Sequence, residues 1–299
     1  MSLLKNVESG IKHRPFFLTV YGVPGIGKTT FAADFEKPLF ADIEKGSGRL
    51  KVDRISEFNG IADLNSLIKD LIKDHHGYKT FVVDTVDAVE RLIVKQVCID
   101  KGKQNIEDIP YGKGYVFAET YWEVLISNLK VLRETMNVIL IAHNAIERVN
   151  DPTQAVTYDQ FNIKLHKKAN ALISEAVDAV LFCAYEVYVK SNQEGTKGKA
   201  FGEGKRVMYT TAIPGHVAKN RFGLPSVIPF EYNAFTSSVF RSEDTKVVEL
   251  YEKLKTDIPR MSDVEAKKKA AVYLEKHKSD LPSLMKMDQR VQEAISGAV

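Results

Sequence analysis

The chain has 299 residues, of which 44% are hydrophobic and 27% charged, and its formal net charge is +3. This composition fits a globular protein with room for one large α/β domain and a small appendage, and the charge neither requires nor excludes nucleic acid. No apolar run approaches the ~20 residues that cross a bilayer, and the N-terminus lacks a secretory signal pattern. We therefore expect a cytoplasmic protein without a membrane partner, in which Cys98 and Cys183 are buried free thiols.

Apolar, β-rich runs alternate with helical patterns through the first two thirds of the chain. Amphipathic helices are predicted at 60–75 and 116–135, where apolar residues recur at helical spacing. Strands are predicted at 15–22, 38–43, 80–85, 137–143 and 179–189. Strands and helices in alternation favour right-handed βαβ units and a mostly parallel sheet.

The pattern changes in the last third of the chain. Beyond residue 186 it predicts antiparallel strands joined by a polar, glycine-rich turn. From Ser242 the sequence is helical and strongly charged, and Ser242 and Ser262 are the predicted helix N-caps. We divide the chain into an N-terminal segment (1–13), a core (14–241) and a helical, charged C-terminal segment (242–299).

The most informative stretch is "GVPGIGKTT", residues 22–30, directly behind the first predicted strand. Glycines let the backbone turn its N–H groups inward, where they form a nest for phosphates with the N-terminus of the following helix. Lys28 would reach the β- and γ-phosphates, and the Thr29 hydroxyl would complete a Mg²⁺ shell. The loop therefore predicts a site for a nucleoside triphosphate with Mg²⁺. Its nucleotide-binding residues are Gly22, Pro24, Gly25, Gly27, Lys28, Thr29 and Thr30.

Polar residues follow the later predicted strands, at the carboxyl edge of a parallel sheet where ligands gather. Asp84 ends the run "FVVD" and is predicted to hold Mg²⁺. Glu44, after "PLFADI", is the candidate to orient or deprotonate the attacking water. His143 and Asn144, after "VILIA", are the candidates to sense the γ-phosphate. Asp87 is interpreted as a helix-start residue.

Two cations stand on either side of one residue in "AKNRFGLP". In a strand, the side chains of Lys219 and Arg221 point to the same side. A cation from a neighbouring subunit can stabilise the charge that spreads over a transferred phosphoryl group. The residue pattern alone favours the simpler interpretation, a solvated pair on an exposed strand.

The order of motifs in this chain resembles that of the RecA-like ATPase core. The motifs are, in order, "GVPGIGKTT", "ADIE", "FVVDT", "LIAHN" and "AKNRFGLP". More narrowly, they look like the phage nucleotide-binding proteins that are minimal RecA-type recombinases, as does "YGKGY" at 111–115. The resemblance covers residues 14–235. It implies a RecA-like α/β fold, ATP with Mg²⁺, and a homo-oligomer, ring or filament, with ATP between protomers. A phage-encoded protein of this kind would act in the cytoplasm of its host.

The resemblance also implies roles for particular residues. It assigns water activation, metal binding and γ-phosphate sensing to the strand-end residues named above. Its Lys-x-Arg pair, which related ATPases insert into the neighbouring subunit's site, matches Lys219 and Arg221. The chain departs from full-length RecA in a shorter interval between Lys28 and Glu44, and in a His-Asn sensor pair instead of Asn-Gln. The predicted catalytic set is Lys28, Glu44, Asp84, His143, Lys219 and Arg221.

In the RecA-like fold two loops on one face line the DNA, and by position they are residues 99–115 and 145–168. Both mix cations with aromatic residues, the combination used in sequence-tolerant binding of single strands. Both also carry acids, and basic loops are often only solvated. With the resemblance, we expect single-stranded DNA as a partner. The predicted contacts are Lys101, Lys103, Tyr111, Lys113, Arg148, Lys164, Lys167 and Lys168.

The expected function is an ATP-dependent recombination protein that binds single-stranded DNA and promotes annealing or exchange of strands. The alternative is a helicase loader or nucleotide switch, because the charged C-terminal helices could dock a helicase or a single-strand-binding protein. A small-molecule phosphotransferase is less favoured because no acceptor pocket is identifiable. A GTPase is disfavoured because the sequence has no Asn-Lys-x-Asp segment to read guanine.

Overall fold

The computed structural model describes residues 14–74, 76–152, 156–190, 199–277 and 281–296. The chain divides into two compact units, one of Arg14–Phe235 and one that includes Thr236–Val299. The predicted N-terminal segment, residues 1–13, lies outside the described residues.

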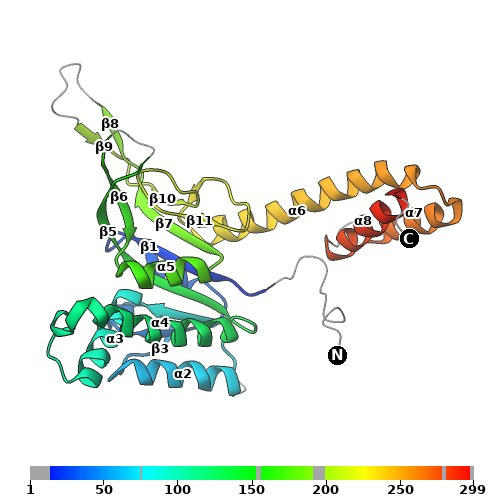
Figure 1. Ribbon diagram of the computed structural model, residues 1–299. Coiled ribbons are helices and arrows are strands. Elements are labelled where there is room, and N and C mark those ends of the chain that lie inside the picture. The colour runs from blue at the N-terminus through cyan, green and yellow to red at the C-terminus, as the bar shows by residue number, and fades with distance from the viewer. Residues whose placement is uncertain (1–13, 75, 153–155, 191–198, 278–280, 297–299) are drawn as a thin grey trace. The chain divides into compact units, whose positions relative to one another are not determined.

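A large mixed sheet forms the centre of the first unit (Figure 1). Its parallel strands lie in the order β7-β1-β5-β4-β2-β3. Strands β1 and β4 are buried along their whole length, as strands covered on both faces must be. The predicted α/β fold with a mostly parallel sheet is therefore confirmed. The parallel strands are β1 (Phe17–Gly22), β2 (Pro38–Asp42), β3 (Asp53–Ile55), β4 (Thr80–Asp84), β5 (Asn137–Val149) and β7 (Ala179–Tyr185).

Antiparallel strands extend this sheet on the β7 side and beyond the end of β5. Strand β10 pairs with β7 and β12, β11 pairs with β7, and β6 pairs with the outer half of β5. Strand β5 is longer than the predicted 137–143, because its polar outer half pairs with β6 outside the apolar core (Figure 1). The antiparallel strands of this sheet are β6 (Tyr158–Ile163), β10 (Arg206–Tyr209), β11 (Lys219–Asn220) and β12 (Val227–Pro229). Strands β8 (Tyr188–Lys190) and β9 (Lys199–Phe201) form a separate two-stranded sheet.

Four helices cover one face of the sheet (Figure 1). Their apolar side chains form one buried cluster with alternate strand residues, among them Val138, Leu140 and Ala142 of β5. The short helix α1 (Lys28–Ala33) packs elsewhere, where Phe31 meets Phe35 and Phe230. The four covering helices are α2 (Ile61–Lys73), α3 (Val86–Lys101), α4 (Lys113–Leu132) and α5 (Lys167–Ala176). Short 3-10 turns occur at Ser47–Arg49, Ile106–Asp108, Pro110–Gly112 and Ile258–Arg260.

The C-terminal residues are helical, as predicted, but the predicted helix starts are wrong. Helix α6 (Tyr232–Asp257) runs through Ser242, because no glycine or proline interrupts the helical pattern there. Helix α7 (Val264–Lys276) is capped by Asp263, whose carboxylate accepts from two backbone N–H groups, and not by Ser262. These helices and α8 (Leu281–Ser296) share a separate core around Leu254, Leu274 and Leu284.

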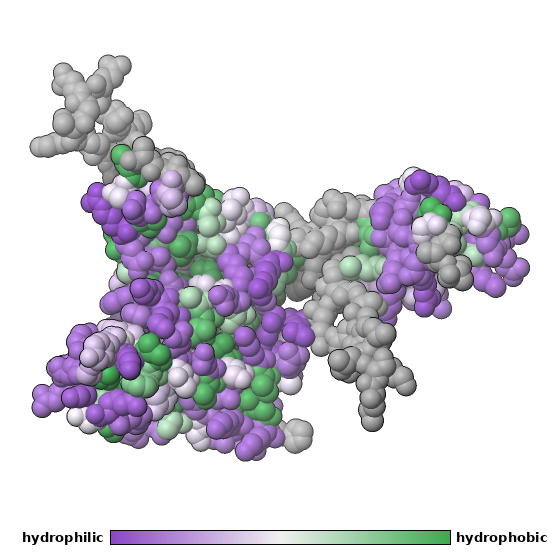
Figure 2. All heavy atoms as spheres, in the orientation of Figure 1, coloured by the Kyte–Doolittle hydropathy of each residue, from purple (hydrophilic) through white to green (hydrophobic). Residues whose placement is uncertain are grey.

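The face in view is largely hydrophilic, with hydrophobic side chains in small groups (Figure 2). Within the described part of the chain, no helix combines the length and apolar character that a bilayer crossing requires. Cys98 and Cys183 are both buried free thiols, as predicted.

Candidate nucleotide site

The phosphate loop connects the end of β1 to the first turn of α1. Its glycines are required by close packing as well as by backbone angles. A Cβ on Gly22 would stand 2.1 Å from the carbonyl oxygen of Cys183 in the neighbouring strand. Gly27 has φ 108°, and a Cβ there would stand 2.6 Å from Nη1 of Arg206. The loop therefore needs glycine at both of these positions.

Lys28 folds back onto the loop that precedes it. Its Nζ donates to the carbonyl oxygens of Gly22 (2.8 Å) and Val23 (3.0 Å). The side chain is buried, and that burial lowers the pKa of the ammonium. The ammonium is thus held against the start of the phosphate loop.

Thr29 and Asp84 meet at the carboxyl edge of the sheet, as predicted for a metal pair. The Thr29 hydroxyl donates to Oδ2 of Asp84 over 2.9 Å. Asp84 ends β4 with only 4% of its surface exposed, and burial raises the pKa of its carboxyl to about 6. A buried carboxylate beside a hydroxyl supplies the hard oxygen donors that Mg²⁺ prefers. These two residues fit the expected metal.

Glu44 is brought to the same edge by a tight turn after β2. Asp42 accepts hydrogen bonds from Gly46 N, Ser47 N and Ser47 Oγ, over 2.9, 3.2 and 2.6 Å. The backbone N–H groups of Ile43 and Glu44 both donate to the carbonyl oxygen of Asp84. The turn therefore holds Glu44 next to the end of β4, where its predicted role requires it.

His143 and Asn144 end the buried part of β5, and they face opposite sides of it. Gly22 and His143 are register partners, so His143 lies directly beside the start of the phosphate loop. Side chains alternate along a strand, so those of His143 and Asn144 leave β5 on opposite faces. Its register position beside the phosphate loop favours His143 over Asn144 as the phosphate sensor. This role stays a prediction for both residues.

Asp87 lies in the first turn of α3, as predicted, and also contacts His143. Its Oδ2 is 3.0 Å from Nδ1 of His143, and its Oδ1 accepts from the His143 backbone N–H over 3.1 Å. Burial opposes the charge of Asp87, but the hydrogen bonds from His143 outweigh it and hold the pKa of this carboxyl below its usual range.

Lys219 and Arg221 lie near the amino-terminal ends of the parallel strands, whereas their own phosphate loop lies at the carboxyl-terminal ends. Strand β11 pairs with the start of β7, whereas the phosphate loop follows the end of the parallel strand β1. The Nζ of Lys219 donates to the carbonyl oxygens of Ser174 (2.6 Å) and Glu175 (3.1 Å) in the last turn of α5. Arg221 stands 3.7 Å from Asp178 and is 54% exposed. Within their own chain, these cations therefore contact α5 and Asp178, away from the phosphate loop.

A family profile described as an AAA domain matches residues 14–222, which is more than half of the chain. The protein belongs to this AAA domain family. It is also similar to the SPbeta prophage-derived uncharacterized protein YorG of Bacillus subtilis (strain 168), with 30% identity over 135 residues. That alignment covers 44% of this chain and 42% of the relative, so the chain spans less than half of the relative's length. An AAA domain with this phosphate loop is a P-loop ATPase.

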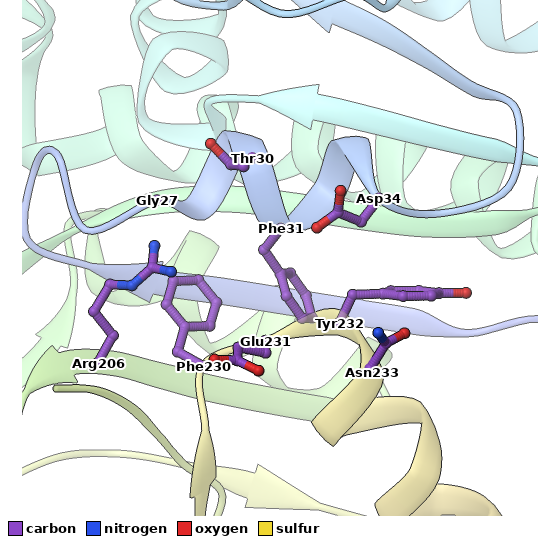
Figure 3. A pocket seen from close by; sticks show the side chains of 9 residues that line it. All are labelled: Gly27, Thr30, Phe31, Asp34, Arg206, Phe230, Glu231, Tyr232 and Asn233. Carbon is purple, nitrogen blue, oxygen red and sulfur yellow. The ribbon is translucent and has the colours of Figure 1, made fainter.

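The unit Arg14–Phe235 also has a cavity of about 530 Å³ beside α1 that the sequence did not predict (Figure 3). Arg206 of β10 donates from Nη1 to the carbonyl oxygen of Ile26 in the phosphate loop, over 3.2 Å. These residues are 180 positions apart, so no local pattern could have connected them. The cavity is lined by Gly27, Thr30, Phe31, Asp34, Arg206, Phe230, Glu231, Tyr232 and Asn233.

The two predicted DNA loops of the AAA domain meet each other. The ring of Tyr115 stacks on that of His166 with centroids 4.0 Å apart. Residues 153–155 of the second loop lie outside the described residues. Lys168 is half-buried and paired with Glu119. The other predicted contacts are exposed, namely Lys101, Lys103, Tyr111, Lys113, Arg148, Lys164 and Lys167.

Proposed function

We propose that this AAA domain protein is a DNA-dependent ATPase that binds single strands and promotes their annealing or exchange, with ATP bound between protomers. When bound with ATP, Mg²⁺ would neutralise phosphate charge, and Thr29 and Asp84 would hold it. Lys28 and the loop N–H groups bind the phosphates, and Glu44 orients the attacking water.

The cavity beside α1 supports a nucleoside as the rest of the ligand. It adjoins Gly27 and Thr30, so a triphosphate in the loop would place its sugar and base toward the cavity. Phe230 and Tyr232 provide aromatic faces for the base, and Asn233 provides an amide that can both donate and accept hydrogen bonds (Figure 3). Aromatic and amide groups of this kind suit recognition of a purine.

The observation that carries the DNA part of the proposal is the position of α3. Its first turn holds His143 through Asp87, beside the phosphate loop. One turn later, Glu90 accepts from the backbone N–H of His166 over 3.0 Å, in the loop that stacks on Tyr115. One helix thus contacts both the candidate phosphate sensor and the meeting point of the two candidate DNA loops. Such an arrangement suits an ATPase whose rate depends on DNA.

The test measures ATP hydrolysis per protomer over a range of protein concentrations, with and without single-stranded oligonucleotide. Because the site is completed by a neighbour, the rate per protomer should rise with protein concentration, and it should rise further with DNA. Particle size is measured in the same samples by light scattering. A rate per protomer that is constant with concentration and indifferent to DNA contradicts the proposal.

A second candidate function is a nucleotide switch that acts on a protein partner. The C-terminal helices favour it, since α7 and α8 line a cavity of about 530 Å³ with both apolar and basic side chains. Stimulation of hydrolysis by DNA alone supports the first function over this one. The cavity is lined by Met261, Ala266, Lys269, Ala270, Tyr273, Lys286, Met287, Arg290 and Val291.

A further inference from the structure

Asp87 holds His143 at two points. One carboxylate oxygen accepts from the backbone N–H of His143, and the other stands 3.0 Å from Nδ1 of its ring. Asp87 is only 5% exposed, so this contact is shielded from water. With Nδ1 facing Asp87, Nε2 is the ring nitrogen left for a ligand at the phosphate loop.

Arg91 ties Glu44 to the same helix. It stands one turn after Asp87 on α3, and its Nη2 donates to Oε1 of Glu44 over 3.0 Å. Its Nη1 lies 3.8 Å from Oδ2 of Asp87, so one guanidinium faces both carboxylates. Glu44 follows β2 and His143 lies in β5, and the first two turns of α3 connect them.

An alternative interpretation is that Glu44, Asp87 and His143 form a metal site. Ligand atoms of Glu44, Asp87 and His143 lie within 4.8 Å of one another. The guanidinium of Arg91 already faces both carboxylates, and Nδ1 of His143 already faces Asp87. Since the positive charge is supplied by the protein itself, the cluster is better explained as an ion-paired network than as a cation site.

We propose that Asp87 and Arg91 are positioning residues for ATP hydrolysis, Asp87 by aiming His143 at the γ-phosphate and Arg91 by aiming Glu44 at the attacking water. The inference rests on the proposed roles of His143 and Glu44. It does not depend on DNA, because all four residues lie at the nucleotide edge of one chain. Neither Asp87 nor Arg91 is required to touch the nucleotide.

The two roles predict different defects. Asp87→Asn keeps the size of the side chain but loses the carboxylate that orients the ring. It should weaken binding of a non-hydrolysable ATP analogue about tenfold, leave ADP binding unchanged, and lower kcat about 100-fold. Arg91→Ala should lower kcat similarly while leaving the affinities for both nucleotides unchanged, because Glu44 faces water rather than phosphate. Arg91→Lys keeps the charge and should restore part of the rate.

The measurements use the full chain without DNA, with fluorescent ADP and a fluorescent non-hydrolysable ATP analogue for binding, and phosphate release for kcat. Matched controls on α3 are Asp100→Asn and Lys95→Ala, both exposed and further along the helix. Unchanged ADP binding shows that a variant is folded. If Asp87→Asn still prefers the ATP analogue over ADP as wild type does, the role of Asp87 is overturned. If Arg91→Ala keeps the wild-type kcat, the role of Arg91 is overturned.

A failure of the proposed function gives a different result. Wild-type hydrolysis that ignores DNA removes the recombination proposal but leaves every comparison between these variants intact. If the wild type binds nucleotides without hydrolysing them, both with and without single-stranded DNA, the role of Arg91 is overturned together with that of Glu44. The preference of Asp87→Asn for the ATP analogue over ADP then still decides the role of Asp87.

Discussion

At the scale of single residues, the buried charge of Asp84 destabilises the fold at the position where Mg²⁺ is expected to bind. Burial raises its pKa to about 6 from an ordinary 3.8, so above pH 6 the folded chain holds a charge that unfolding would hydrate. This loss of folding stability is complete above pH 6 and becomes smaller as the pH falls toward 3.8. We expect Asp84→Asn, in EDTA without nucleotide, to raise the free energy of unfolding at pH 8 by about 1–3 kcal/mol. About half of this gain should remain at pH 5.

Urea unfolding at the two pH values measures this gain, and the same variant should lose ATP hydrolysis because its metal carboxylate is gone. Asp42→Asn is the matched control, since Asp42 is also buried at a strand end but accepts three hydrogen bonds. It should lower stability at both pH values. An Asp84→Asn protein that is no more stable than wild type at pH 8 would refute the account of the Asp84 charge.

The site residues that were predicted from the sequence all belong to patterns of neighbouring residues in the chain. Lys28 and Thr29 belong to a contiguous motif, and Asp84 follows an apolar strand directly. Arg206 escaped prediction because its contact with the loop is made only by the antiparallel pairing of β10 with β7. Arg91 could have been found, because it stands four residues after Asp87 on one helix face. Local motifs therefore predicted the residues that bind the phosphates. The residues around them are brought together by tertiary pairing, which the sequence pattern does not show.

At the scale of elements, the outer half of β5 and strand β6 form a hairpin that continues directly from the candidate phosphate sensor. The apolar pattern ended the predicted strand at residue 143, because β5 leaves the core there and only its pairing with β6 continues it. Arg148 is exposed on this hairpin and Lys164 directly after it, and the backbone N–H of Lys164 donates to the carbonyl oxygen of His143. If DNA binds the hairpin as proposed, the hairpin is the element through which it would act on His143.

We expect Lys164→Glu to weaken binding of single-stranded DNA and to lower the slope of log affinity against log salt by about 1. The physical reason is the loss of one phosphate contact and of the counterion that it releases. Fluorescence anisotropy at several salt concentrations measures both quantities. Lys69→Glu, an equal charge change on an exposed position of α2, should leave the slope unchanged. Equal slopes for Lys164→Glu and wild type would remove the hairpin from the DNA surface.

At the scale of the whole molecule, the phosphate loop and the Lys219–Arg221 pair lie at opposite ends of the parallel strands of one chain. If the pair completes a site, as proposed, it does so on another copy stacked head to tail, and such heterologous contacts generate rings or filaments. Lys219 also donates to the last carbonyl groups of α5, so its removal would disturb the fold. Arg221 is the better probe, because Arg133 remains to pair with Asp178 when Arg221 is replaced.

We expect Arg221→Ala to lower ATP hydrolysis about 10³-fold, because a cation that stabilises the transferred phosphoryl group is lost from every site. Lys28→Ala should be equally inactive for a different reason, the loss of its own phosphate loop lysine. In an equal mixture, a site is intact when an Arg221→Ala chain supplies the loop and a Lys28→Ala chain supplies the arginine. Random assembly makes about one site in four intact, so the mixture should regain about a quarter of the wild-type rate. A mixture as inactive as its components would show that Lys28 and Arg221 do not share a site across protomers. A dilute Arg221→Ala monomer that hydrolyses ATP at the wild-type rate would show that Arg221 is not needed for hydrolysis.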